Sequence, residues 1–256
     1  MKQFPKVSIL GVEIHKIATE DVLSTVEKWL ECKDKPRIIC TPNEDHAMKA
    51  RRDESFRQII NHADLAVPDG MAIVRASRIL GTPLPGAVNG RLLALELCKL
   101  AAARGWSVFF LGGQAGAAES AARKLVASYP TLKVAGSFCP RYGFVLGDDE
   151  DKRAVESVTR ACPDILLVGL GAPKQEKWIT AHLGDLQVPV SIGVGYAFDI
   201  LGGLVREPPI WITRVGLEWL YRLSIEPKRL WRRYLVEGPV FVSLALKSKC
   251  MRRKLC

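Results

Sequence analysis

Long hydrophobic runs are absent from this sequence. No apolar stretch in its 256 residues approaches the ~18 residues that a membrane-spanning helix needs, and no apolar signal segment follows Met1. Hydrophobic residues make up 48% of the chain and charged residues 25%, as in ordinary soluble proteins. We therefore expect a cytoplasmic protein with one large domain, or one domain and an appendage.

Paired cysteines and clustered histidines are also lacking. The seven cysteines include no C-x-x-C pair and the four histidines show no paired spacing. This argues against a disulfide framework and against a thiolate or imidazole metal site. The run Asp149-Glu150-Asp151 contains a D-x-D pattern, which can hold a metal–nucleotide complex, but it begins an expected helix, where acidic residues favour the helix dipole. We interpret it as a helix start and predict no required metal and no cofactor.

Net positive charge is small outside the last fifth of the chain. Residues 200–256 contain 12 Lys and Arg against four Asp and Glu, which accounts for +8 of the formal net charge of +10. Basic and aromatic residues are interspersed there: Trp211, Arg214, Trp219, Arg222, Lys228, Arg229, Trp231, Arg232 and Arg233. Such a segment suits an anionic, partly apolar partner such as a membrane surface or a lipid diphosphate. The alternative is a solvated basic helix pair.

Helical and strand patterns alternate along residues 20–194. Short apolar runs predict strands at 37–41, 65–67, 108–111, 134–137, 165–169 and 190–194. Helical spacing predicts helices at 20–31, 44–60, 71–80, 91–104, 115–128, 149–161 and 174–183. Continuously apolar strands separated by helices indicate an α/β fold, a Rossmann-like parallel sheet with helices on both faces. Such sheets bind ligands at the carboxyl ends of their strands.

The pattern changes after Gly203. Breaks at Arg206-Glu207-Pro208-Pro209 and at Gly238-Pro239 separate segments with helical spacing. We predict an α/β domain at residues 1–203 and a small, mainly helical, basic and Trp-rich appendage at residues 204–256. A sheet edge or an apolar helix face could support a homo-oligomer.

Polar residues follow several of the expected strands. Asp69 would lie at the carboxyl edge of the sheet, where its carboxylate could take a proton from a substrate hydroxyl. It could instead cap the next helix, because Asp before Gly is common in turns. Thr41 and Asn43 follow the first strand and offer a hydroxyl and an amide to a polar ligand, or else a helix cap.

Glycine loops follow two further strands. Gly112 and Gly113 lead from a strand into a helix, where backbone amides could hold a phosphate, although a tight turn explains them too. The dinucleotide motif G-x-G-x-x-G is missing, which argues against hydride transfer. Lys174, Gln175 and Glu176 open another helix after a glycine loop. The loops with Asp69, with Thr41 and Asn43, and with residues 171–176 would lie at one edge of the sheet, which indicates a binding site there.

Six motifs occur along nearly the whole chain: TPN at 41–43, ADLAVPDG at 63–70, LGG at 111–113, GAPKQE at 171–176, GVGYAFD at 193–199 and GLEWLYR at 216–222. In this order the chain resembles the WecG/TagA/CpsF glycosyltransferases. The resemblance implies an inverting, metal-independent enzyme that moves a sugar from a UDP-sugar donor to an undecaprenyl-diphosphate-linked sugar, for bacterial surface polysaccharide or teichoic acid. It implies binding to an anionic membrane surface at the cytoplasmic face, with no nucleic acid partner.

The resemblance also implies roles for particular residues. Asp69 would be the catalytic base, Thr41 and Asn43 would line the site, and Gln175 would contact substrate. Tail arginines would bind the acceptor diphosphate and dock the enzyme on lipid. The remaining candidate substrate-binding residues are Arg91, Gly112, Gly113, Lys174, Glu176, Arg222, Arg229 and Arg232.

One segment departs from the family pattern. Where relatives usually have Arg-Val-x-Gly-x-Asp, this chain has Ala87-Val88-Asn89-Gly90-Arg91-Leu92, without the arginine or the acid. Arg91 could supply the missing charge; otherwise the substrate preference has shifted or the activity is reduced.

Three other functions fit parts of the sequence. A nucleic-acid-binding module would use the basic aromatic tail, but it leaves the strand-end loops unexplained. A nucleotide-dependent oxidoreductase would bind nicotinamide or flavin. A catalytically dead scaffold is the third alternative, because of the substitutions around Gly90.

Overall fold

The computed structural model describes residues 3–206, 209, 212 and 217–255. Within these ranges, side-chain placement is not described for Glu218, Arg229 and residues 251–255. Trp211 and Arg214 of the aromatic and basic tail lie outside the described residues.

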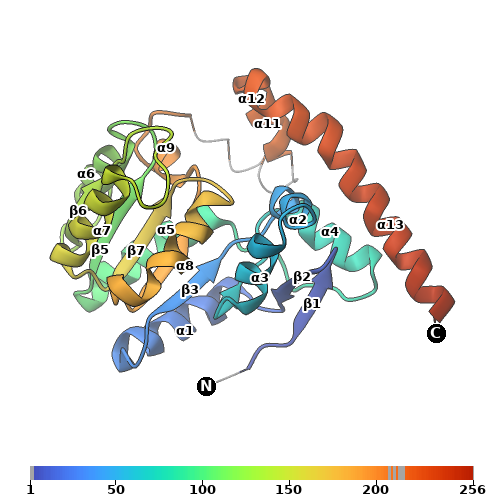
Figure 1. Cartoon of the computed structure of the whole chain (residues 1–256), viewed down its shortest axis with the longest axis horizontal. Coiled ribbons are helices and arrows are strands. Elements are labelled where there is room, and N and C mark those ends of the chain that lie inside the picture. Colours follow the sequence, from blue (N-terminus) through green and yellow to red (C-terminus); the bar gives the residue numbers. More distant parts are fainter. Residues whose placement is uncertain (1–2, 207–208, 210–211, 213–216, 256) are drawn as a thin grey trace.

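The central sheet consists, in the described part of the chain, of six parallel strands in the order β4-β3-β8-β7-β5-β6 (Figure 1). Their bounds are β3 Arg37–Cys40, β4 Leu65–Ala66, β5 Ser107–Gly112, β6 Lys133–Phe138, β7 Ile165–Gly169 and β8 Val190–Gly193. Each strand coincides with one of the expected apolar runs, so the predicted parallel sheet is confirmed.

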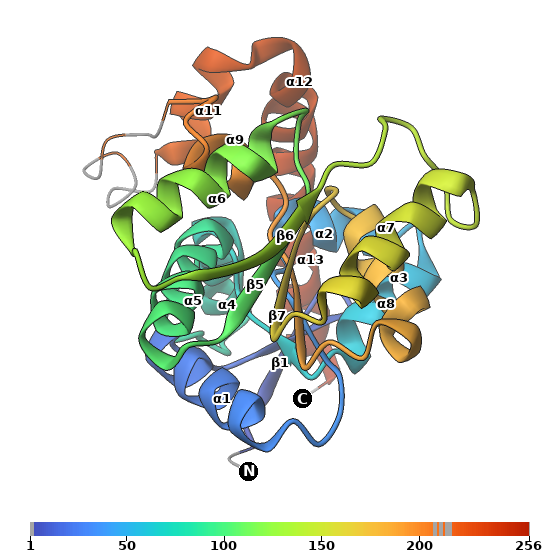
Figure 2. The same cartoon turned by 90° about the vertical axis from the view of Figure 1, so that its left-hand side faces the viewer.

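Helices cover both faces of the sheet (Figure 2). One layer contains α1 Thr19–Cys32, α5 Gly90–Arg104, α6 Ala117–Ser128 and α9 Ala197–Leu201; the other contains α2 Glu44–Ala50, α3 Glu54–His62, α7 Asp149–Ala161 and α8 Lys174–Leu186. Successive side chains of a strand point to opposite layers: Phe109 and Leu111 belong to one buried cluster, Val108 and Phe110 to the other. The strands are therefore apolar without alternation.

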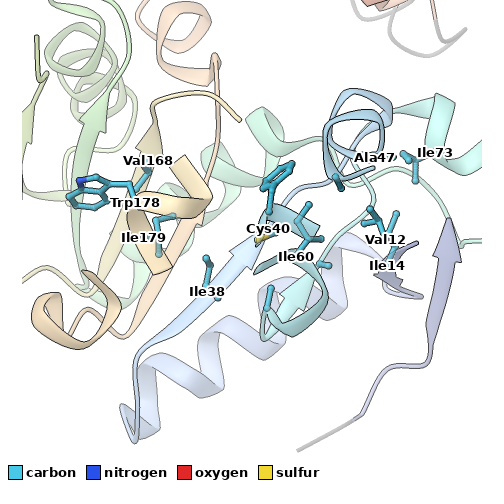
Figure 3. Close-up of a cluster of buried hydrophobic side chains, with 14 of the residues drawn as sticks. Val12, Ile14, Ile38, Cys40, Ala47, Ile60, Ile73, Val168, Trp178 and Ile179 are labelled. Carbon is cyan, nitrogen blue, oxygen red and sulfur yellow. The ribbon is translucent and has the colours of Figure 1, made fainter. Parts of the chain in front are cut away.

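Figure 3 shows part of the cluster in the second layer. Ile38 and Cys40 of β3 and Val168 of β7 contribute from the sheet, and Trp178 and Ile179 of α8 contribute from the helix above it. This packing fixes α8 against the sheet, which places the first turn of α8 at the carboxyl end of β7.

The predicted single helix at 44–60 is wrong. The chain turns after α2, and Asp53 starts α3 by accepting a hydrogen bond from the Phe56 amide at 3.0 Å. Helical spacing continued through the break because Arg51 and Arg52 carry no turn signal such as Gly or Pro. The short α2 that results begins directly after β3.

A hairpin that the periodicity did not indicate precedes the sheet. Its strands are β1 Lys6–Ile9 and β2 Val12–His15, joined through Leu10 and Gly11 with φ of 52° and 88°. Leucine is an unusual residue for such a turn, which explains the weak sequence signal. The Ala66 amide donates to His15 Nδ1 at 2.9 Å, so the hairpin lies beside β4 at the sheet edge.

The tail is mainly helical, as predicted. It contains α11 Glu218–Ile225, α12 Pro227–Trp231, the π-helical η1 Arg232–Glu237 and α13 Gly238–Leu255. Helix α13 lies against α2 and α4 Met71–Ile79 (Figure 1). Phe241 and Ala245 are 1% and 0% exposed and share a buried cluster with Met48 and Ile73. The tail therefore completes the hydrophobic core of the body. The division into two domains at residue 203 stays a prediction.

Candidate active site

The carboxyl ends of four adjacent strands bring the strand-end motifs together. In sheet order, Asp69 follows β4, Asn43 follows β3, Gly195 follows β8 and Gln175 follows β7. A line of side-chain hydrogen bonds crosses all four loops. The predicted convergence of the Asp69, Asn43 and Gln175 loops at one edge is thus seen in the structure.

Asp69 is held from two sides. The Gly90 amide at the start of α5 donates to Oδ1 at 3.2 Å, and Asn43 Nδ2 donates to Oδ2 at 3.3 Å. The Asp69 amide donates to the Pro42 carbonyl at 3.0 Å, which joins the loops after β3 and β4. A carboxylate has about four lone-pair positions, so two donors leave room for a substrate hydroxyl.

The surroundings of Asp69 shift its proton affinity. Burial raises the pKa of the carboxyl group above its ordinary value, while the Gly90 amide, the Asn43 amide and His46 act in the opposite direction without cancelling it. Asp69 does not cap α4, whose N-cap residue is Gly70. A carboxylate with a raised pKa accepts a proton more readily than an ordinary one, which is what a general base requires.

Asn43 has one of the two roles that the sequence left open, that of a helix cap, and its contact with a ligand stays a prediction. Its Oδ1 caps α2 by accepting from the amides of Asp45 and His46 at 3.1 and 3.2 Å, and it also faces His46 Nδ1 at 2.8 Å. This fixes the amide so that Nδ2 points to Asp69. Sequence reasoning set His46 aside as an isolated histidine; its position three residues after the cap was the signal that it reaches the site.

Gln175 joins two strand-end loops. Its Oε1 accepts from the amides of Gly171 and Gly195 at 3.2 and 3.0 Å, and its Nε2 donates to Glu176 Oε1 at 2.7 Å. The side chain is only 1% exposed. In this structure the Gln175 amide shapes the site through protein contacts, and its predicted contact with substrate stays a prediction.

Thr41 supports the site from behind. It is buried, and its hydroxyl donates to the Gly193 carbonyl at 3.0 Å, which links the ends of β3 and β8. A side chain at Gly90 would meet Thr41 Oγ1 at 3.4 Å, so the start of α5 packs closely on it.

The glycine pair after β5 lies where the backbone closely approaches the end of β7. A Cβ atom on Gly112 would lie 2.8 Å from the Gly169 carbonyl oxygen, and Gly112 has a φ of 99° that side chains disfavour. The Gly113 amide donates to the same carbonyl at 2.9 Å. The Gly113 amide proton is thus used within the sheet, and the predicted phosphate contact of this loop stays a prediction.

Two other predicted binding residues point elsewhere or are enclosed. Lys174 Nζ donates to the Phe144 carbonyl and lies 3.3 Å from the centroid of the Phe144 ring, in the loop before α7. Burial lowers the pKa of Lys174. Arg91 is 8% exposed in the first turn of α5, where its amide is bonded to the Asn89 side chain at 3.1 Å. The Lys174 contacts do not involve Asp69, and the predicted substrate contact of Arg91 stays a prediction.

The tail reaches the strand ends through Arg222. Its guanidinium lies 5.7 Å from the centroid of the Tyr196 ring, directly after β8. The Tyr196 hydroxyl donates to Glu226 at 3.0 Å, which fixes α11 and α12 over this loop. Arg232 is exposed on η1, whereas the side chain of Arg229 lies outside the described residues.

Sequence reasoning missed Arg233 as the residue that ties the tail to the site. Its Nη2 donates to Glu44 Oε1 at 3.0 Å, one residue after Asn43. Burial alone would lower the pKa of Arg233, but the carboxylates of Glu44 and Asp45 outweigh it and raise that pKa. No periodicity reports such a pair, because its partners are 189 residues apart.

The D-x-D pattern acts as a helix start. Asp148 caps α7 by accepting from the Asp151 amide at 2.8 Å, and Asp151 accepts from Trp178 Nε1 at 2.7 Å. No group of three His, Cys, Asp or Glu side chains in the described part of the chain could hold a metal ion.

Comparison with known proteins identifies the family. The model of the glycosyl transferase WecG/TagA/CpsF family matches residues 7–255. The chain is 30% identical over 245 residues to the N-acetylglucosaminyldiphosphoundecaprenol N-acetyl-beta-D-mannosaminyltransferases of Staphylococcus aureus strains NCTC 8325 and COL, covering 95% of this chain and 93% of each relative. These matches favour a transferase over an oxidoreductase or a nucleic-acid-binding module. The chain therefore belongs to the WecG/TagA/CpsF family of glycosyl transferases.

Proposed function

We propose that this glycosyltransferase moves a sugar from a UDP-sugar to an undecaprenyl-diphosphate-linked sugar, in the synthesis of a bacterial surface polymer. The names of the S. aureus relatives support this acceptor class, because they transfer N-acetyl-beta-D-mannosamine to N-acetylglucosaminyldiphosphoundecaprenol.

The proposed reaction is a single displacement at the anomeric carbon of the donor. The acceptor hydroxyl forms the new bond to that carbon, its proton passes to Asp69, and the bond to UDP breaks with both electrons leaving on the diphosphate. Attack opposite to the leaving group inverts the anomeric configuration. Cationic side chains of the tail, with Arg222 over the loop after β8, would stabilise the charge on UDP without a metal ion.

The geometry of Asp69 carries this proposal. Its carboxyl group lies at the carboxyl edge of the sheet, where ligands of such sheets bind, and two donors orient it. Burial raises its pKa.

A transfer assay tests the proposed base and the absence of a metal. Lipid-diphosphate acceptor analogues are incubated with a panel of UDP-sugars, with and without chelator. Asp69→Asn should reduce kcat at least about 100-fold, the usual contribution of a general base. Asp53→Asn is the control, because asparagine can also cap α3. Full turnover by Asp69→Asn would refute the role of Asp69, and loss of wild-type turnover with chelator would refute metal independence.

We also propose that the tail docks the enzyme on an anionic membrane at the inner face of the cell membrane. Exposed apolar side chains extend along α12, η1 and α13, beside basic ones: Trp231, Leu235, Val236, Val240, Val242 and Leu246 with Lys228, Arg232 and Lys247. Apolar area and positive charge together favour the surface of an anionic bilayer. Among the described residues, no helix is long and apolar enough to cross a bilayer.

Vesicle flotation tests the membrane surface. Removing the tail would expose the core around Phe241, so point substitutions are the better probe. Trp231→Ser, Leu235→Ser and Leu246→Ser together should weaken binding to phosphatidylglycerol vesicles at least about tenfold, by loss of buried apolar area. Val126→Ser with Val145→Ser, two exposed sites on the body, should change nothing. Equal loss in the control pair would refute a tail-specific surface.

A further inference from the structure

His46 lies between two acceptors. Its Nδ1 is 2.8 Å from Asn43 Oδ1 and its Nε2 is 3.3 Å from Glu176 Oε1. The ring is 6% exposed and lies 5.8 Å from the Phe56 ring, centroid to centroid. This places a buried imidazole between the first turn of α8 and the residue that contacts Asp69.

The contacts of Asn43 determine which ring nitrogen of His46 donates to it. Asn43 Oδ1 already accepts from two backbone amides, so the ring nitrogen that faces it must donate. Nδ1 therefore carries a proton, and Nε2 faces the carboxylate. The third donor makes the reversed orientation of the amide costly, because that orientation would turn Nδ2 toward three donors and Oδ1 toward Asp69.

Glu176 fixes the other side of the ring. Its side chain is fully buried; Oε1 accepts from Gln175 Nε2, whereas Oε2 has no hydrogen-bond partner in the described part of the chain. A buried carboxylate without a compensating charge or proton is strongly unfavourable. His46 Nε2, 3.3 Å from Glu176 Oε1, is the ring nitrogen placed to donate to this carboxylate.

We propose that His46 and Glu176 are positioning residues for the base, holding Asn43 in the orientation that donates to Asp69. Glu176 orients the His46 ring, the ring orients the Asn43 amide, and the amide holds Oδ2 of Asp69. This inference rests on the proposed function, because it assumes that Asp69 accepts the proton of the acceptor.

Other charged groups surround this line of contacts. Glu44 is paired with Arg233 of η1 at 3.0 Å, and Asp45 is paired with Lys49 at 2.7 Å. Despite its partner, the Glu44 carboxylate still contributes to raising the pKa of Asp69. Positive charge on His46 and the Asn43 donor both lower the pKa of Asp69, so losing them should raise it further.

The pH dependence of kcat/KM tests the positioning role. In His46→Phe, which keeps a ring beside Phe56, the acidic limb should move up by about one pH unit, as expected for loss of a nearby charge and donor. Glu176→Gln should move it in the same direction, and it provides a second variant if His46→Phe does not fold. A ¹³C titration of the Asp69 carboxyl group, assigned with Asp69→Asn, should show the same shift without substrate.

His182→Phe is the matched control. His182 Nε2 also faces a buried carboxylate, Asp151 at 3.1 Å, on the part of α8 that packs on α7. The acidic limb of the kcat/KM profile of His182→Phe should match that of the wild type. If Asp69→Asn is inactive while the limbs of His46→Phe and Glu176→Gln match the wild type, the positioning role is wrong and the base assignment stands. If Asp69→Asn remains active, the base assignment itself is wrong.

Discussion

Arg233 connects the tail to the edge of the active site, and its removal should loosen that connection by a measurable amount. Both Nε and Nη2 donate to Glu44 Oε1, at 3.3 and 3.0 Å, and the two side chains are 23% and 15% exposed. Exposed ion pairs contribute about 0–1 kcal/mol, and breaking a fully buried pair costs about 3–5 kcal/mol. For this intermediate burial we expect Arg233→Met to lower the free energy of unfolding by about 2 kcal/mol.

Urea denaturation of a double-mutant cycle measures this interaction. Glu44→Gln with Arg233→Met should cost about 1–2 kcal/mol less than the sum of the single substitutions, because the double variant leaves no unpaired charge. The single variant Arg233→Met should also lower Tm by about 4–8 °C in a chain of this size.

Arg52 provides the control, because it pairs the segment after α2 with Glu237 of η1. Arg52 Nη1 lies 3.4 Å from Glu237 Oε1, but its side chain is 66% exposed. Arg52→Met should therefore cost less than about 1 kcal/mol. The reasoning would be refuted if the effects of Glu44→Gln and Arg233→Met add within about 0.5 kcal/mol, or if Arg52→Met costs as much as Arg233→Met.

Three further predictions concern stability. Burial and Lys6 lower the pKa of His15 to about 4, so between pH 6.5 and 4 only the unfolded chain takes up this proton. The free energy of unfolding should therefore fall by about 2 kcal/mol from pH 7 to pH 5 through this group. Urea titrations at several pH values should show that His15→Gln lacks this pH-dependent loss. Gly112→Ala should cost about 2–3 kcal/mol in the same assay, because its Cβ would clash with the Gly169 carbonyl at positive φ. Gly184→Ala should instead raise stability by about 0.5–1 kcal/mol, since it lies within α8 with open space around it, and an unchanged or lower Tm would contradict this.

The sheet and the strand-end loops were predictable because their signals are local. Strands buried on both faces are continuously apolar, as in Phe109 to Leu111, and polar residues directly after such strands lie at one edge. Asp69 and Asn43 could be placed there on that basis. The order of the strands determines which of them meet, and it does not follow from periodicity.

The parts that sequence reasoning missed depend on side-chain direction and on distant partners. Lys174 was expected near the substrate, but its stem runs toward Phe144. The Gly113 amide was expected to be available, but the neighbouring strand end uses it. His46 and Arg233 gain their importance from Glu176 and Glu44, each more than 100 residues away along the chain.

Because α13 supplies the last part of the core, the order in which the ribosome delivers the chain matters. The sheet and helices α1 to α9 are synthesised first. Until α13 follows, the apolar faces of α2 and α4 are not covered by Phe241 and Ala245. Glu44 likewise depends on Arg233 of η1, a residue made much later, for its guanidinium partner. Chains that stop before α13 should therefore leave the apolar faces of α2 and α4 exposed to solvent and be prone to aggregation.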